Sequence, residues 1–137
     1  MRILLVLLMS FMIGAPAAAF SDADRAAIQS TIERQLQAFL ADDAATAYSF
    51  ASPGIKALFP TKDIFMDMVR QGYQPVYRPR QHAFGALEEK AGHLEQSVDI
   101  IDANGEAWTA LYTLEMQPDG SWKITGCMLL KKPGKVA

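Results

Sequence analysis

The strongest candidates for chemistry are four polar residues in the second half of the chain: His82, Glu88, Gln96 and Tyr112. Each stands in a segment of alternating apolar and polar residues, on the side that carries the apolar ones. Gln96 and Tyr112 could hydrogen-bond a ligand in an apolar pocket, with His82 or Glu88 accepting a proton at one end. The structural alternative is a buried hydrogen bond between Tyr112 and Gln96 beside a partly exposed His82, and buried polar groups usually have such a partner.

The predicted pocket wall has four lining candidates: His82, Gln96, Trp108 and Tyr112. A glycine, Gly126, is expected beside Tyr112 and leaves space that a side chain would otherwise fill. Aromatic residues in the first half of the chain could also line a ligand cavity, although aromatic residues at helical spacing are more often core. These are Tyr48, Phe50, Phe59, Phe65 and Tyr73.

Other chemistries find little support in the sequence. Cys127 is the single cysteine, so no disulfide and no multi-thiolate zinc site is expected within one chain. His82 and His93 fall on opposite faces of the expected sheet and cannot share a metal ion. The sequence contains neither a glycine-rich phosphate-binding loop nor the G-x-S-x-G nucleophile elbow of serine hydrolases. We therefore expect no metal and no cofactor, and a non-catalytic protein rather than an enzyme.

The charge balance gives no sign of a nucleic-acid partner. The 137 residues include 13 Lys and Arg against 15 Asp and Glu, a formal net charge of −2, and the basic residues do not cluster. Half of the residues are hydrophobic, which is ordinary for a globular domain. The length is enough for one domain, even without the N-terminal leader described next.

The first nineteen residues have the pattern of a secretory signal peptide. Arg2 precedes an apolar run over residues 3–13, and small residues then lead to expected cleavage after Ala19. A membrane anchor needs about 20 consecutive apolar residues, and this run is too short. We expect an exported protein, periplasmic or secreted, with residues 20–137 as its single mature domain and no membrane attachment after cleavage.

Helical periodicity marks the first half of the mature chain. Apolar residues recur at four-residue steps from Ile28 to Leu40, and Ser21 with Asp24 resembles a capping box, so a helix should begin near Asp22. A short second helix is predicted over 44–51, with one further turn over 55–59. A third helix should follow Thr61 and end at Gly72. Pro75 and Pro79 are expected to exclude regular structure beyond it.

The second half alternates with a period of two and predicts an antiparallel meander. Strands are expected at about 80–89, 93–102, 106–117 and 121–130, joined by three-residue turns that each end in glycine. Hydrophobic matching pairs Ile100 with Trp108 and Leu114 with Ile124. The helices must cover the apolar face of this sheet, so the predicted fold class is α+β, with three N-terminal helices packed on a bent four-stranded antiparallel sheet.

The opposite face of the predicted sheet also gathers apolar residues. With regular pairing throughout, Ile101, Leu111, Cys127 and Leu129 fall on this reverse face. Apolar patches on an otherwise solvated face mark interaction sites, and we expect a homodimer through these four residues.

Several motifs resemble known proteins. The order of helices and bent meander resembles the nuclear transport factor 2-like, or cystatin-like, superfamily, whose members form a cone with a pocket between helices and sheet. The motifs themselves resemble a bacterial family, domain of unknown function 4864, over nearly all of the mature chain. A short strand that the wider superfamily has between its second and third helices is not evident here. The residues that carry the resemblance are 35–39, 42–43, 47–53, 68–73, 75–79 and 119–127.

The resemblance implies a fold but no established activity. Isomerase-like and dehydratase-like members of the superfamily place an acid or a His–Asp pair inside the cone, whereas Asp99 here projects from the other face and Asp102 lies at a turn. Our leading hypothesis is a non-catalytic binding module for a small apolar ligand or a protein partner. The alternatives are an enzyme that uses the cone for acid–base chemistry and a structural or immunity-type accessory protein.

Overall fold

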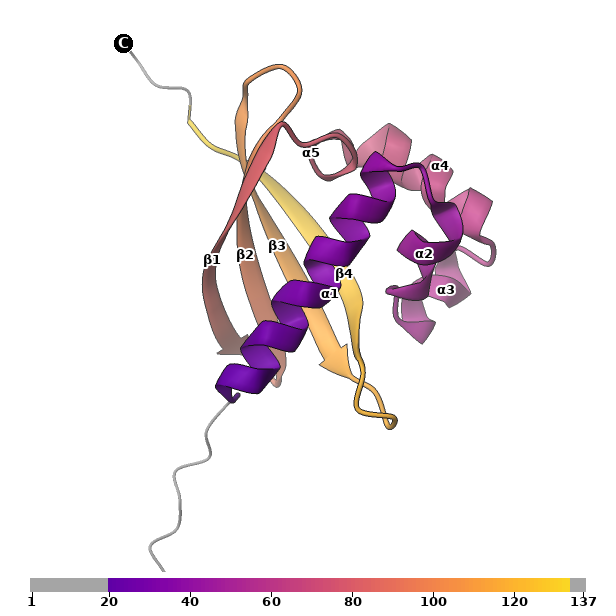
Figure 1. The fold of residues 1–137 in the computed structure, drawn as a ribbon, viewed down its shortest axis with the longest axis vertical. Coiled ribbons are helices and arrows are strands. Elements are labelled where there is room, and N and C mark those ends of the chain that lie inside the picture. The colour runs from indigo at the N-terminus through magenta and orange to yellow at the C-terminus, as the bar shows by residue number, and fades with distance from the viewer. Residues whose placement is uncertain (1–19, 134–137) are drawn as a thin grey trace, which may run out of the picture.

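The structure is a computed structural model that describes residues 20–133. The predicted signal peptide and its cleavage site after Ala19 lie outside the described residues. Within these, helices come first and strands last, which confirms the α+β prediction (Figure 1). The elements are α1 (Asp22–Leu40), α2 (Ala44–Ser49), α3 (Pro53–Leu58), α4 (Lys62–Gly72), α5 (Gln74–Tyr77), β1 (Gln81–Lys90), β2 (His93–Ile101), β3 (Ala107–Met116) and β4 (Trp122–Lys131).

The helices number five in residues 20–133 rather than the three expected. The further turn after the second helix is a separate helix, α3, for which Ser52 is the N-cap. The expectation that Pro75 excludes regular structure was wrong, because Pro75 occupies the first turn of α5, where a missing N–H breaks no helical hydrogen bond. No helix in this part of the chain combines the length and hydropathy needed to cross a bilayer.

Helix α1 supplies most of the helical core. The predicted capping box at its start is present: the Ser21 hydroxyl accepts from the Asp24 N–H, and the Asp24 carboxylate accepts from the Ser21 N–H. Its buried stripe includes Ile28, Ile32 and Leu36, none of which has exposed surface. Figure 1 shows α1 crossing the sheet diagonally, with the shorter helices grouped beyond its C-terminal half.

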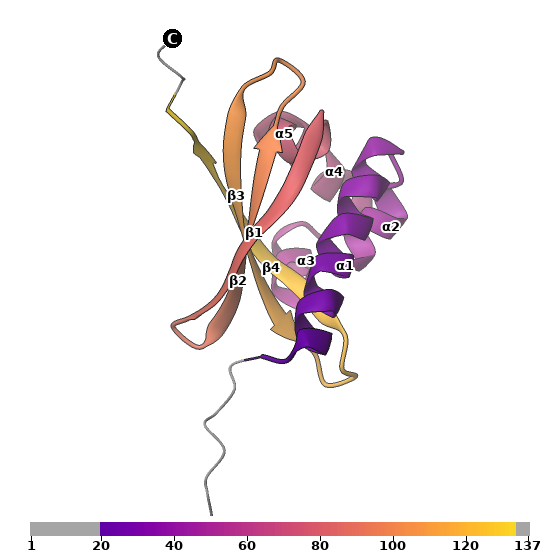
Figure 2. The same ribbon diagram turned by 60° about the vertical axis from the view of Figure 1, so that its left-hand side comes forward.

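The sheet is the predicted meander, in the order β1-β2-β3-β4 with every neighbour antiparallel. It is strongly twisted, and all five helices lie on one side of it (Figure 2). The second and third turns have three residues with glycine in the left-handed region, Gly105 at φ 81° and Gly120 at φ 85°. The first turn has two residues instead, because Lys90 pairs directly with His93.

The register between β2 and β3 is the predicted one, including Ile100 with Trp108 and Gln96 with Tyr112. The outer pairs each contain a bulge that regular alternation did not anticipate. In β1 an extra residue between Phe84 and Leu87 brings Leu87 opposite Gln96 and turns Glu88 outward, where it is exposed. A one-residue slip of this kind exchanges the two faces of the strand beyond it.

The bulge in β4 corrects the predicted dimer face. Thr113 pairs with Gly126 and Leu114 with Ile124, so Thr125 is the extra residue. Beyond it Cys127 pairs with Tyr112, and Cys127 and Leu129 pack against the core on the helix side. The placement of these two residues on the reverse face was therefore wrong, whereas Ile101 and Leu111 stay on it. On the reverse face, Met128 and Leu130 stand where Cys127 and Leu129 were predicted, and both are exposed.

A single parallel bridge joins Ala51 to Ile124 at the junction of α2 and α3. The Ile124 N–H donates to the Phe50 carbonyl at 2.8 Å and the Ser52 N–H donates to the Ile124 carbonyl at 2.9 Å. This one-residue bridge ties the short helices to β4.

Asp102 organises the turn between β2 and β3. Its carboxylate accepts from the N–H groups of Asn104 and Glu106, both at 2.9 Å, and from the Trp108 ring N–H at 2.9 Å. Burial alone would raise the pKa of Asp102, but these hydrogen bonds to the charged form lower it below its ordinary value.

We predict that Asp102→Asn lowers the melting temperature at neutral pH and that its difference from the parent shrinks below about pH 4. A carboxyl group whose pKa is lower in the folded state contributes stability above its unfolded pKa and loses it as the pH falls through its folded pKa. Thermal unfolding from pH 7 to pH 3 measures this. Asp99→Asn, at an exposed aspartate on β2, is the control and should change little. A difference between Asp102→Asn and the parent that is constant with pH would contradict the prediction.

Candidate functional site

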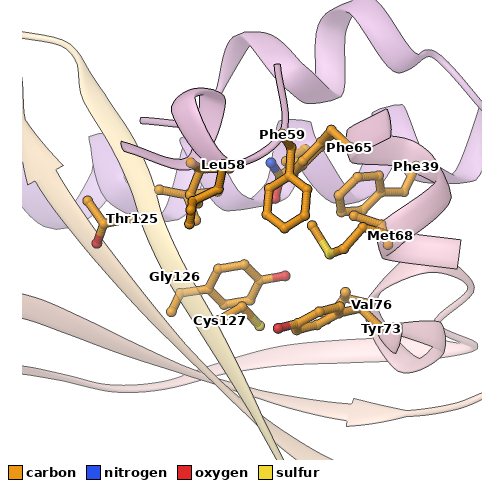
Figure 3. Close-up of a pocket in the computed structure, with 15 residues that line it drawn as sticks. Phe39, Leu58, Phe59, Phe65, Met68, Tyr73, Val76, Thr125, Gly126 and Cys127 are labelled. Carbon is orange, nitrogen blue, oxygen red and sulfur yellow. The ribbon is translucent and has the colours of Figure 1, made fainter. Parts of the chain in front are cut away.

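A cavity of about 380 Å³ lies between the short helices and the middle of β4. Figure 3 shows aromatic rings and the Met68 thioether on its helical side and Thr125, Gly126 and Cys127 on its sheet side. The volume is within the range of small-molecule sites. The lining residues are Gln35, Phe39, Ile55, Leu58, Phe59, Phe65, Met68, Val69, Tyr73, Val76, Tyr112, Ile124, Thr125, Gly126 and Cys127.

The cavity lining is apolar and carries no formal charge. None of the lining residues is Asp, Glu, Lys, Arg or His. One of its polar side chains already has a partner, since the Gln35 amide donates to the Ala47 carbonyl at 3.1 Å. Within residues 20–133, no group of three or more metal-ligating side chains comes together anywhere. The chemistry that this lining offers a ligand is therefore hydrophobic burial with a few neutral hydrogen-bonding groups.

The Tyr112 hydroxyl is the exceptional polar group of the cavity. Tyr112 is 1% exposed, and its hydroxyl has no hydrogen-bond partner of good geometry in the described residues. Burial, together with the adjacent Cys127 thiol, raises the pKa of Tyr112 well above its ordinary value. Burial raises the pKa of Cys127 to about 12. Both groups are thus neutral at physiological pH, and neither is a nucleophile there.

The helical wall is held by an ionic cluster outside the cavity. Asp42 accepts hydrogen bonds from the Tyr77 hydroxyl and from Arg78 Nη2, the latter at 2.7 Å. Arg78 also donates to the Phe39 carbonyl at 2.5 Å, and its guanidinium lies 3.9 Å from the centre of the Tyr77 ring. The hydrogen bond from Tyr77 is the main reason that the pKa of Asp42 is lowered. This cluster joins the end of α1 to α5 and so positions Phe39, which lines the cavity.

Of the four predicted pocket residues, only Tyr112 lines this cavity; His82, Gln96 and Trp108 do not. His82 lies on β1, where its Nε2 is 2.5 Å from Glu33 Oε2 of α1 and its ring meets Phe84 edge-on. Burial opposes ionisation of Glu33, but hydrogen bonds from His82 and Gln37 outweigh it and lower the pKa of Glu33. This pair joins the first strand to the first helix.

Gln96 and Trp108 make hydrogen bonds within the fold instead. The Trp108 ring N–H donates to the Asp102 carboxylate, as described above. The Gln96 amide donates to the Gly85 carbonyl at 3.0 Å and the Ser97 carbonyl at 2.8 Å, and its oxygen accepts from Gln29. Gln96 therefore bonds to a backbone carbonyl of the β1 bulge and to a carbonyl of its own strand. Its predicted hydrogen bond to Tyr112 is absent from the described contacts, which is why the tyrosine hydroxyl is left unpaired.

The structure brings Tyr112 together with aromatic residues that helical spacing alone would place in the core. Phe59, Phe65 and Tyr73 line the cavity, and so does Gly126. The predicted pairing of Gly126 with Tyr112 was wrong, because the bulge in β4 places Cys127 opposite Tyr112 and Gly126 opposite Thr113. Phe39, Met68 and Val76 were missed as lining residues, because helical spacing identifies a buried face without telling whether the opposing surface fills it. The phenylalanines in the short helices were the feature of the sequence that could have indicated a cavity lining here.

We predict that Tyr112→Phe leaves the free energy of unfolding of the ligand-free protein unchanged or raises it by up to about 1 kcal/mol, because it removes a buried hydroxyl without a partner. Tyr48→Phe is the matched control: the Tyr48 hydroxyl donates to the Phe59 carbonyl at 2.6 Å, and its loss should cost about 1 kcal/mol. Urea unfolding measures both. A loss of stability in Tyr112→Phe as large as that in Tyr48→Phe would show that this hydroxyl has a structural role.

Comparisons with known proteins agree with this architecture. A crystal structure of an NTF2-like protein of unknown function from Shewanella baltica OS155 superposes with a TM-score of 0.57 at 14% identity, over 82% of this chain and 96% of that one. An NTF-2-like protein of unknown function from Silicibacter pomeroyi DSS-3 superposes with a TM-score of 0.55 at 16% identity, over 82% of this chain and 100% of that one. No curated protein matches the sequence. Residues 21–137 match the family model described as Domain of unknown function (DUF4864), and the chain belongs to that family, with an NTF2-like fold.

Proposed function

We propose that the mature, exported chain is a binding module that holds a small apolar ligand in the cavity between the short helices and β4. The observation that carries the proposal is an uncharged space of about 380 Å³ that the large side chains around it leave open. Folded interiors are close-packed, and an unfilled apolar space forgoes dispersion contacts that a ligand would restore. The signal-peptide pattern of residues 1–19 supports the export of the chain.

Binding is favoured over acid–base catalysis by the protonation states in the cavity. The two adjacent side chains on the sheet wall that could exchange a proton, Tyr112 and Cys127, both have raised pKa values and hold their protons at neutral pH. A catalytic base should have a pKa near the working pH. The one His–carboxylate pair in residues 20–133, His82 with Glu33, involves no lining residue.

The helix α3 provides a route into the cavity. None of its residues is buried, and Leu58 at its end both lines the cavity and is 75% exposed. Figure 3 shows Leu58 on the helical side of the cavity, across from Thr125. A large apolar side chain in water at the edge of an apolar cavity is in position to be covered when a ligand enters.

We predict that the neutral fluorophore N-phenyl-1-naphthylamine binds the parent and that Met68→Trp weakens binding at least about tenfold, or 1.4 kcal/mol. The indole would occupy the space into which Met68 extends (Figure 3). Ile64→Trp is the control, since Ile64 is on the same helix but is exposed and outside the lining. Ile55→Trp, at a partly buried lining residue, repeats the test from α3 if the first variant is unstable. Equal affinity in the filled and control variants would contradict the proposal.

We also propose that the uncovered face of the sheet joins two copies of the chain. Met128 is 60% exposed and Leu130 is 46% exposed on this face, and Leu111 is the strand partner of Met128. Figure 2 shows no described element over this side of the sheet. Adjacent apolar side chains on one uncovered face suit a self-complementary twofold contact.

We predict that Leu130→Glu converts a dimer to a monomer, because a carboxylate facing its own symmetry mate loses hydration without a partner. Leu40→Glu is the control, since Leu40 is 44% exposed on the helical side. Sedimentation velocity at tens of micromolar separates the two species. A parent that is monomeric at that concentration, or a dimer that survives Leu130→Glu, would refute the second proposal without affecting the first.

A further inference from the structure

The Tyr112 hydroxyl indicates which ligands the cavity selects, and this inference rests on the proposed function. Tyr112 is buried, lines the cavity and has no well-aligned partner in residues 20–133. A buried hydroxyl without a partner costs stability, and a partner that a ligand brings removes the cost. We infer that the ligand is an uncharged, largely hydrocarbon molecule with one hydrogen-bond acceptor oxygen, as in a ketone, aldehyde, ester or amide, and that this oxygen accepts from Tyr112.

The ligand should be neutral because nothing in the lining compensates a charge. A carboxylate or ammonium group needs a counter-ion or several strong hydrogen bonds when it leaves water. The lining contains no ionised side chain, and the amide of Gln35 is already bonded to a backbone carbonyl. A fatty acid or an amine could bind only with its charged group outside the cavity.

The ligand should offer an acceptor because the neighbour that can share the Tyr112 proton in the described residues is only a thiol. This neighbour is the Cys127 thiol, which also lines the cavity. Sulfur is a weak acceptor, so it competes poorly with an oxygen atom for the Tyr112 proton. The raised pKa of Tyr112 is consistent with this role, because the hydroxyl keeps the proton that it must donate.

The remaining requirement, that the ligand be mostly hydrocarbon, follows from the side chains around the hydroxyl. Phenylalanine rings from α1, α4 and the end of α3 form the far wall, and Met68 and Val76 complete it (Figure 3). Aromatic walls favour flat or ring-containing molecules through edge and face contacts. Benzophenone, with two rings and one carbonyl oxygen, is a suitable probe, and diphenylmethane is its counterpart without the oxygen.

The test compares the affinities of benzophenone and diphenylmethane for the parent, Tyr112→Phe and Tyr73→Phe, by displacement of N-phenyl-1-naphthylamine. Each variant is judged by the ratio of the two affinities. A general change in how strongly the variant binds hydrophobic compounds therefore cancels out. We expect Tyr112→Phe to shift this ratio about tenfold against the ketone. Tyr73→Phe, which removes a second hydroxyl from the same cavity, should leave the ratio within about twofold. Diphenylacetate should bind the parent at least about tenfold more weakly than its neutral amide.

The outcomes separate the two proposals. If neither neutral compound binds the parent, the proposed function is wrong and this inference falls with it. If both bind but the ratio is the same in Tyr112→Phe, or shifts equally in Tyr73→Phe, the cavity binds ligands and the assignment to Tyr112 is overturned. Equal binding of diphenylacetate and its amide would overturn the requirement for a neutral ligand. Photolysis of bound benzophenone gives an independent readout, and cross-links confined to peptides outside the lining would also contradict the assignment.

Discussion

The one-residue bulge at Thr125 in β4 is the constraint on which the rest of the site depends. It exchanges the faces of β4 between Ile124 and Cys127, so that Cys127 and Leu129 face the helices while Met128 and Leu130 face away. A glycine suits the next position because a Cβ atom on Gly126 would lie 3.0 Å from the Thr113 hydroxyl. The same bulge thus creates the sheet wall of the cavity and the exposed apolar patch behind it.

The helices around the cavity are short and are anchored at its edges. Helix α1 packs along the sheet without exposed core residues, and the cluster of Asp42, Tyr77 and Arg78 joins its end to α5. The bridge from Ala51 to Ile124 fixes the junction of α2 and α3 to β4. The cavity lies between these attachments, with residues of α3 and α4 on its helical side and residues of β4 on its sheet side. The cavity is therefore a consequence of where the helices are fixed.

The buried polar groups of this protein fall into two classes. Gln96 and Asp102 are buried with their hydrogen bonds made, and each bonds to backbone groups at a bulge or a turn. Tyr112 lies in the same layer, opposite Gln96 across the strands, yet its hydroxyl has no such partner. Buried polar groups are nearly always satisfied, so the Tyr112 hydroxyl is the exception on which the proposed ligand contact rests.

Local rules in the sequence determined the class of fold and much of its detail. The capping box at Ser21, the glycine turns at Gly105 and Gly120 and the pairing of β2 with β3 all follow from spacing, because they depend on neighbours in the chain or on hydrophobic matching across one turn. Tyr112 and Gly126 could likewise be placed beside a space. Only the tertiary structure decided the bulges in β1 and β4, since an extra residue that twists a strand leaves no mark in a two-residue period. For this reason Cys127 was assigned to the wrong face, and the hydrogen bonds that engage Gln96 could not be foreseen. Whether the helical phenylalanines fill the space above Tyr112 depends on packing between distant segments, and that is set by where the helices are anchored rather than by the order of residues within any one of them.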